Sequence, residues 1–295
     1  MASQPHRRPR ILLGITGSVA AVKGPELAIR ISRDLKMDVC ILLTRGGQNF
    51  WQKSRDYNEQ LWEEVQKRLK AGKSDSISKK EGSIQLHGKS SHKFLVDLNF
   101  ILIPVRLTFR FTPFILIFHL TITHLNQSSD ADEEWKGWNR LGDPVLHIEL
   151  RDWADLFVIS PLSAHTLAKI AQGLCDDTLS CVARAWDFGH GIRPGKPLVL
   201  APAMNTAMWD HPISQQQLVT IQGFWKGHPE DKFFSINANA ANESQQFTLF
   251  GFKIIALQVK TLACGELGNG ALAPVEDILE AIEDSILKFF STRQA

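Results

Sequence analysis

Cysteine is scarce in this sequence, and its spacing excludes the usual cysteine-built sites. The chain has 295 residues and four cysteines, with no CxxC pair and no metal-ligand spacing to the ten histidines: Cys40, Cys175, Cys181 and Cys264. We therefore expect neither a zinc site nor a disulfide framework, and no bound metal. A reducing compartment agrees with this cysteine usage, so a cytoplasmic location is expected.

An excess of charge of one sign is also missing. Lys and Arg total 33 and Asp and Glu total 31, so the formal net charge is +2. Because nothing in this balance demands a polyanion, no nucleic-acid partner is expected. With 44% hydrophobic residues the chain can bury a large core. Its expected partners are small molecules and further copies of itself.

No long hydrophobic run is free of charge. The most apolar stretch, residues 100–125, carries Arg106 and Arg110 near its middle. A charge at the centre of a membrane span costs about 2.5–3.5 kcal/mol on insertion scales, so we expect no membrane span. Residues 1–10 are basic and lack an apolar core. They are expected to be a disordered tail, neither a secretory signal nor an anchor.

Apolar runs that alternate with helical patterns are the main fold signal. The runs cover residues 11–16, 39–44, 155–160, 197–201 and 253–257, and a helical pattern from Val275 to Phe289 closes the chain. This alternation predicts an α/β fold with a doubly wound parallel sheet. The expected architecture is a Rossmann-like or flavodoxin-like three-layer sandwich, formed by a single domain over residues 11–290.

Two segments do not fit this alternation. Residues 51–128 combine a charged helix-prone piece, a Lys/Ser-rich stretch and an apolar run, and residues 225–250 are rich in Asn and Gln. Connections longer than roughly 15 residues are uncommon in compact domains. We interpret both segments as insertions at surface loops, and intron sequence kept in a gene model is one origin for them.

The turn after the run at 197–201 is the strongest site candidate. It places Asn205 between Met204 and Met208 in the segment Pro202-x-Met204-Asn205-x-x-Met208-Trp209. In open α/β sheets ligands lie outside the carboxyl ends of the strands, and an amide beside pliable thioethers suits a small polar molecule. The alternative is a helix N-cap at Asn205 with both methionines in the core.

Other polar residues are expected at the ends of other strands. Gly17 and Ser18 follow the first strand, where small residues and a helix start favour a phosphate, although this turn is neither a GxGxxG nor a P-loop motif. Ser163 follows the run at 155–160. His147, in the run 144–150, is likewise expected near a strand end, and the alternative for it is a half-buried strand histidine.

Together, the segment around Asn205, His147 in Leu146–Leu150 and Cys264 in Ala263–Gly265 resemble the flavin-dependent cysteine decarboxylases. The resemblance covers residues 10–50, 130–222 and 252–287, in the order of the family's motifs. The run 143–155 looks like the branch of this family that serves coenzyme A biosynthesis. The resemblance implies an enzyme that uses FMN to convert 4′-phosphopantothenoylcysteine into 4′-phosphopantetheine.

The resemblance also implies roles for particular residues. The flavin is expected to contact residues that follow four of the predicted strands: Gly17, Ser18, Val19, Thr44, Ser163, Ala164, His165, Thr166 and Ala203. His147 is expected to act as a base or positioning group, and Asn205, with Met208 beside it, to hold the substrate carboxylate. Cys264 is expected to protonate the enethiol that forms after CO₂ leaves.

Members of this family are trimers, so the resemblance implies a homotrimer with active sites shared between neighbouring subunits. The alternative function is a non-catalytic regulatory subunit of the same fold that binds a protein phosphatase. A flavin prenyltransferase is disfavoured by the Asn205 and Cys264 motifs. Three residues near the expected ligands depart from the family pattern: His165, Asp177 and Leu272. The carboxylate of Asp177 is expected to repel a phosphorylated substrate.

Overall fold

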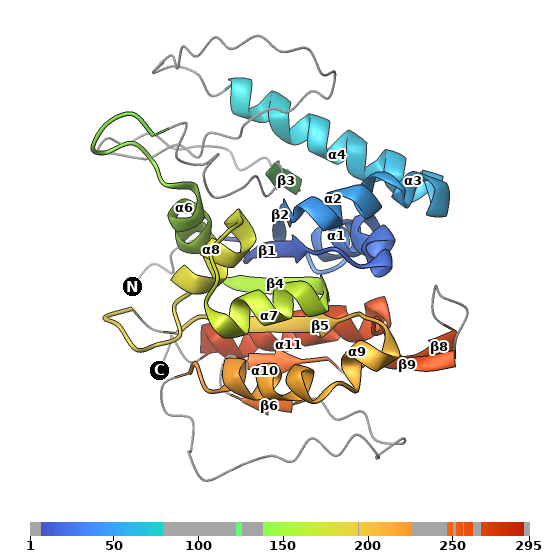
Figure 1. The fold of residues 1–295 in the computed structure, drawn as a ribbon. Helices are drawn as coiled ribbons and strands as arrows, with labels where there is room; N and C mark the ends of the chain where they lie inside the picture. The colour runs from blue at the N-terminus through green and yellow to red at the C-terminus, as the bar shows by residue number, and fades with distance from the viewer. Residues whose placement is uncertain are drawn as a thin grey trace.

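The computed structural model shows a central sheet with helices on both faces (Figure 1). It describes residues 7–78, 122–125, 138–193, 195–225, 247–249, 252–255, 257–261 and 267–291, and the structural statements below refer to these residues.

A seven-stranded sheet forms the centre of the described fold. Its strands, in chain order, are β1 (Arg10–Ile15), β2 (Asp38–Leu43), β3 (Ile122–Leu125), β4 (Leu156–Leu162), β5 (Leu198–Pro202), β6 (Phe247–Leu249) and β7 (Phe252–Ile254). The spatial order is β3-β2-β1-β4-β5-β7-β6, and all neighbours are parallel except β6 and β7. Because the order turns back between β1 and β4, the sheet is doubly wound, which confirms the predicted fold class.

The five strands expected from apolar runs are β1, β2, β4, β5 and β7. Every residue of β4 and β5 is buried, and β1 and β2 are buried after their first residue. A strand covered on both faces is apolar along its whole length instead of alternating. This is why continuous apolar runs located these strands in the sequence.

Helices cover the sheet and connect its strands. They are η1 (Val19–Lys23), α1 (Gly24–Arg33), α2 (Arg45–Gln52), α3 (Ser54–Tyr57), α4 (Glu59–Ser78), α6 (Leu146–Trp153), α7 (Ala164–Gln172), α8 (Thr178–Ala185), α9 (Thr206–Trp209), α10 (Pro212–Gln222) and α11 (Val275–Ser291). The expected closing helix is α11. Two further strands, β8 (Gln258–Thr261) and β9 (Leu267–Ala271), pair with each other as an antiparallel hairpin.

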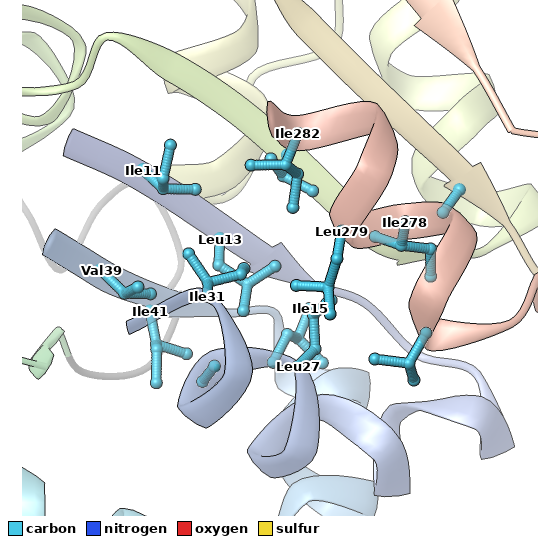
Figure 2. Packing of buried hydrophobic residues seen from close by; sticks show 14 of the residues in the cluster. Ile11, Leu13, Ile15, Leu27, Ile31, Val39, Ile41, Ile278, Leu279 and Ile282 are labelled. Atoms are coloured by element: carbon cyan, nitrogen blue, oxygen red, sulfur yellow. The ribbon is translucent and has the colours of Figure 1, made fainter. Parts of the chain in front are cut away.

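Each face of the sheet has its own hydrophobic core. Ile11, Leu13 and Ile15 of β1 belong to the first core, which also contains buried residues of α1, α4 and α11. Figure 2 shows this packing, with Ile278 and Ile282 of α11 facing the strands. Leu12 belongs to the second core, built with α6, α7, α8 and α10. Alternate residues of one strand therefore face opposite cores.

The segment that carries His147 differs from its expected structure. The sequence predicts His147 near a strand end, but residues 146–153 form the helix α6, and two residues separate this helix from β4. The run Leu146–Leu150 alternates apolar and polar residues, which is typical of a strand, yet Leu146, Leu150 and Trp153 also follow helical spacing. These three side chains pack in the second core, and that packing favours the helix.

The ranges interpreted as insertions contain ordered elements. Within 51–128, α4 packs beside α1, and its Val65 and Leu69 are buried in the first core. The strand β3, residues 122–125, lies in the same range and pairs in parallel with β2. Within 225–250, β6 pairs with β7. The division into one domain with two insertions stays a prediction. Large parts of both ranges lie outside the described residues.

None of the helices in the described ranges combines the length and apolar character needed to cross a membrane.

The carboxyl ends of β1 and β4 are joined by one buried hydroxyl. Thr16 is fully buried, and its Oγ1 donates to the carbonyl of Pro161 at 2.7 Å and accepts from the backbone N–H of Ser163 at 2.7 Å. Its own N–H also donates to the Pro161 carbonyl, at 3.2 Å. Since these two strands flank the point where the strand order turns back, Thr16 fixes the geometry of that point.

We predict that Thr16→Val lowers the free energy of unfolding by about 1–3 kcal/mol, because it leaves the buried N–H of Ser163 without an acceptor. The matched control is Thr178→Val. Among the described contacts, the buried Thr178 hydroxyl has no hydrogen-bond partner, so the same isosteric change there is expected to be neutral or stabilising. Urea unfolding of both variants checks this, and equal effects would contradict the role of Thr16.

Candidate active site at the carboxyl edge of the sheet

Four neighbouring strands are each followed, within three residues, by a residue that caps the next helix. Ser18 follows β1 and caps η1, Thr44 follows β2 and caps α2, Ser163 follows β4 and caps α7, and Asn205 follows β5 and caps α9. Since these strands are parallel neighbours, their carboxyl ends lie at one edge of the sheet. The structure therefore brings the expected strand-end residues together along this edge.

The turns after β1 and β2 touch through their glycines. A Cβ placed on Gly46 would lie 2.8 Å from the Cα of Gly17, so only glycine allows this approach. Thr44 Oγ1 accepts from the N–H of Gly47 at 3.1 Å, and the Thr44 N–H donates to the Ile15 carbonyl. Gly17 and Val19 remain exposed beside these contacts. This part of the edge presents backbone and one apolar side chain to solvent.

The turn after β4 is a compact hydroxyl cluster. Ser163 Oγ accepts from the N–H of Thr166 at 3.3 Å and lies 3.2 Å from Thr166 Oγ1, and both side chains are buried. Ala164 is half-buried, and His165 is exposed on the first turn of α7. Of this group, His165 is therefore the side chain best placed to reach a ligand from solvent.

The turn after β5 is held from two sides. Ala203, which is buried, donates its N–H to the Leu162 carbonyl at 2.9 Å. Met204 donates its N–H to the Gly270 carbonyl of β9 at 3.0 Å, and a Cβ on Gly270 would lie only 2.0 Å from the Met204 oxygen. The hairpin of β8 and β9 therefore lies directly against the residue before Asn205.

Asn205 is both a helix cap and a candidate ligand-binding residue. Its Oδ1 accepts from the N–H of Ala207 at 2.9 Å, as the N-cap alternative predicts. Half of the Met208 side chain is exposed (54%), whereas Met204 is buried. The two methionines thus divide the expected roles, because Met204 packs in the core and Met208 lies open at the edge.

The chemistry of this edge suits a neutral or anionic ligand. The helices α2 and α7 begin here, and the positive end of a helix dipole favours anions. Next to Asn205, the buried hydroxyl of Thr206 has no hydrogen-bond partner within the described part of the chain. No group of three or more His, Cys, Asp and Glu side chains with metal-site geometry occurs among the described residues. The edge therefore offers hydroxyls, amides and backbone groups to a ligand.

His147 lies away from this edge. It is half-buried in the first turn of α6, and α6 leads into the amino end of β4, whereas Asn205 follows the carboxyl end of β5. Figure 1 shows α6 at the left and α9 at the right of the view, toward opposite ends of the strands. One chain therefore does not bring His147 and Asn205 together. Cys264 lies outside the described residues.

Two of the residues that depart from the family pattern have structural roles. Leu272 is buried in the first core, 5% exposed. Asp177 caps α8 through a hydrogen bond from the N–H of Ser180, and its other oxygen is 2.8 Å from Lys169 Nζ. Asp177 therefore has a structural role at the start of α8, and α7 lies between it and Ser163 in the chain.

Lys169 forms ion pairs with two carboxylates. Lys169 Nζ lies 2.7 Å from Asp176 as well as 2.8 Å from Asp177. Burial opposes the charged form of Lys169, but the hydrogen bonds to the two carboxylates outweigh it and raise the lysine pKa. The hydrogen bond from Lys169 also lowers the pKa of Asp176. Because two carboxylates share one lysine, the expected repulsion of a phosphorylated substrate by Asp177 stays a prediction.

Two hollows lie elsewhere on the surface. One, of about 390 Å³, is lined by Arg55, Trp62, Glu63, Gln66 and Lys67 of α3 and α4. The other, of about 270 Å³, lies beside the ends of α7, α8 and α10, and its lining includes Phe188, His190 and Phe224. Neither includes a predicted site residue, so the strand-end residues and not these hollows define the candidate site.

Comparison with known families decides the classification. A family model described as Flavoprotein matches residues 1–287. The chain belongs to the Flavoprotein family. This confirms the resemblance that the motifs around Asn205, His147 and Cys264 indicated.

Two curated relatives are named as phosphopantothenoylcysteine decarboxylases. The chain is 45% identical over 142 residues to a probable phosphopantothenoylcysteine decarboxylase of Arabidopsis thaliana, covering 48% of this chain and 55% of the relative. It is 41% identical over 167 residues to phosphopantothenoylcysteine decarboxylase of Mus musculus, covering 57% of this chain and 66% of the relative. Measured by these alignments, the chain spans roughly half to two thirds of the length of these relatives.

Two solved structures of the family share the fold over nearly the whole chain. One is a cysteine-to-serine mutant of PPC decarboxylase complexed with pantothenoylaminoethenethiol, with a TM-score of 0.55, 28% identity, and coverage of 94% of this chain and 97% of the other. The second is the FMN binding protein AtHal3, with a TM-score of 0.52, 30% identity, and coverage of 94% and 95%.

Proposed function

We propose that this chain is an FMN-dependent decarboxylase that converts 4′-phosphopantothenoylcysteine into 4′-phosphopantetheine and CO₂. One observation carries the proposal: four neighbouring strand ends place Ser18, Thr44, Ser163 and Asn205 along one edge. Membership of the Flavoprotein family and the decarboxylase relatives support it. The reaction belongs to coenzyme A biosynthesis, and we place it in the cytoplasm.

The residues at the edge fit FMN. The close approach of Gly17 and Gly46 leaves bare backbone where a flavin chain can lie, and Ser18 provides a hydroxyl for its phosphate and ribityl side. Thr44, the segment from Ser163 to Thr166, and Ala203 would surround the rest of the cofactor. No lysine is needed, because hydroxyls and backbone amides bind phosphate.

The residues of the chain would then divide the remaining chemistry. When bound, FMN supplies reversible two-electron oxidation at the cysteine end of the substrate, which makes loss of the carboxylate easier. Asn205, beside Met208, would hold that carboxylate with neutral hydrogen bonds. A lysine there would stabilise the charge that disappears in the transition state, so an amide suits the reaction better. His147 would take or position a proton, and Cys264 would protonate the enethiol.

The position of His147 supports a site shared between two copies of the chain. Since α6 and α9 lie toward opposite ends of the strands, the His147 of one subunit would meet the Asn205 and Cys264 of its neighbour. We propose a homotrimer with three such shared sites. The closed ring that this head-to-tail arrangement needs is a common assembly for soluble proteins.

We predict that Asn205→Asp lowers kcat/KM for CO₂ release by about 100-fold or more, because a carboxylate there repels the carboxylate of the substrate. The variant should stay folded and keep its flavin, since Asp is as good an N-cap as Asn. Asn58→Asp is the matched control, because Asn58 is also a helix cap. Its exposed Oδ1 accepts from the N–H of Leu61, and it is not among the candidate site residues.

CO₂ release from 4′-phosphopantothenoylcysteine and the visible flavin spectrum are measured on the purified proteins. An Asn205→Asp variant as active as Asn58→Asp would contradict the role of Asn205. A colourless, inactive wild-type protein that binds a protein phosphatase would instead support the non-catalytic alternative.

Shared sites predict complementation between two inactive variants. His147→Asn and Asn205→Asp should each be nearly inactive, whereas trimers that contain both kinds of subunit should regain activity, up to about a quarter of the wild-type rate if subunits mix at random. Co-expression with two different affinity tags yields the mixed trimers. Mixed assemblies no more active than either parent would show that each site uses residues of one chain.

A further inference from the structure

Lys196 is a buried cation at the end of the helix that carries His147. Its Nζ donates to the carbonyl of Arg151 at 2.6 Å and to the carbonyl of Ala154 at 2.9 Å. Arg151 lies in the last turn of α6, and Ala154 is the C-cap of this helix. A cation at this position also interacts favourably with the negative end of the helix dipole.

The other contacts of Lys196 come from the segment after α8. Its ammonium group lies 5.4 Å from the centre of the Trp186 ring and 3.9 Å from Asp187 Oδ2. The Trp186 indole N–H donates to the Lys196 carbonyl at 3.1 Å, and the Lys196 N–H donates to the Asp187 carbonyl at 2.7 Å. The residue is thus fixed at both its backbone and its side chain, between the end of α8 and the end of α6.

Stability alone does not account for a lysine at this place. Only 9% of Lys196 is exposed, and burial lowers its pKa because the charged form is poorly solvated. A whole buried ion pair can often be replaced by apolar residues without loss of stability, so pairing with Asp187 does not by itself explain the lysine. What an apolar residue would not provide is a pair of hydrogen bonds that fixes the last turn of α6.

The helix α6 needs such an anchor. It has eight residues, and its N-cap Val145 makes no side-chain capping bond. Helices this short are marginal without tertiary contacts. His147 precedes Arg151 by four residues, one helical turn, so the carbonyl that Lys196 binds lies one turn from the histidine.

We propose that Lys196 is a positioning residue, which holds α6 so that His147 is presented to the active site of the neighbouring subunit. This inference rests on the proposed role of His147. Lys196 does not touch substrate or cofactor in this account, since it acts through the helix backbone.

A kinetic cycle on the full FMN-loaded protein tests the inference. Lys196→Met is expected to lower kcat for CO₂ release by about 10- to 100-fold with KM changed less than about twofold, because a catalytic group displaced by about 1 Å loses this much rate. Lys196→Arg, which can still donate to two carbonyls, should recover part of the rate. In a His147→Asn background, Lys196→Met should cause no further loss.

Arg193→Met is the matched control. Arg193 is half exposed and pairs with Asp152 of α6, so it contacts the same helix from the surface. Exposed ion pairs contribute little, and its kcat should stay within about twofold of the wild type. If Lys196→Met does not fold, Lys196→Gln takes its place in the cycle, because its side chain is shorter and cannot donate to both carbonyls as the lysine does.

Amide hydrogen exchange separates this inference from the proposed function. Lys196→Met should accelerate exchange over residues 146–153 and leave α10, residues 212–222, unchanged, whether or not the protein is active. Unchanged exchange over 146–153 would overturn the inference. So would an equal loss of rate from Lys196→Met in the wild-type and His147→Asn backgrounds. An inactive wild type with accelerated exchange in the variant would instead refute the proposed reaction and keep the anchoring role.

Discussion

The buried hydroxyl of Thr16 is the contact on which the geometry of the candidate site depends. It joins the ends of β1 and β4 through Pro161 and Ser163, where the strand order turns back. Ser18 and Thr44 lie on one side of this junction, and Ser163 and Asn205 on the other. A shift between β1 and β4 would therefore separate the two halves of the edge. The proposed flavin site needs both halves in fixed register.

The molecule divides its candidate chemistry between the two ends of the parallel strands. The strand ends with Asn205 offer amides, hydroxyls and exposed Met208, whereas His147 lies on α6 beside the amino end of β4. Each end has its own anchor: the β8–β9 hairpin packs against Met204, and Lys196 binds the end of α6. This separation is the physical reason to propose an assembly in which neighbouring copies complete each other's sites.

Much of the fold could be predicted from the sequence, because buried parallel strands are continuous apolar runs and polar caps follow them directly. The helix at His147 could not, since Leu146–Leu150 fits both a strand and a helix and only packing in the second core decides between them. The contacts of Lys196 join residues more than forty positions apart. Sequence spacing carries no signal for such pairs. Asp177 likewise became interpretable only once Lys169 was found beside it.

Binding of FMN to the purified, assembled protein tests the central claim most directly. Titration followed by the quenching of flavin fluorescence should saturate at one FMN per chain, because each carboxyl edge offers one set of caps around Thr16. Folded protein that shows no saturable binding of FMN would contradict the account.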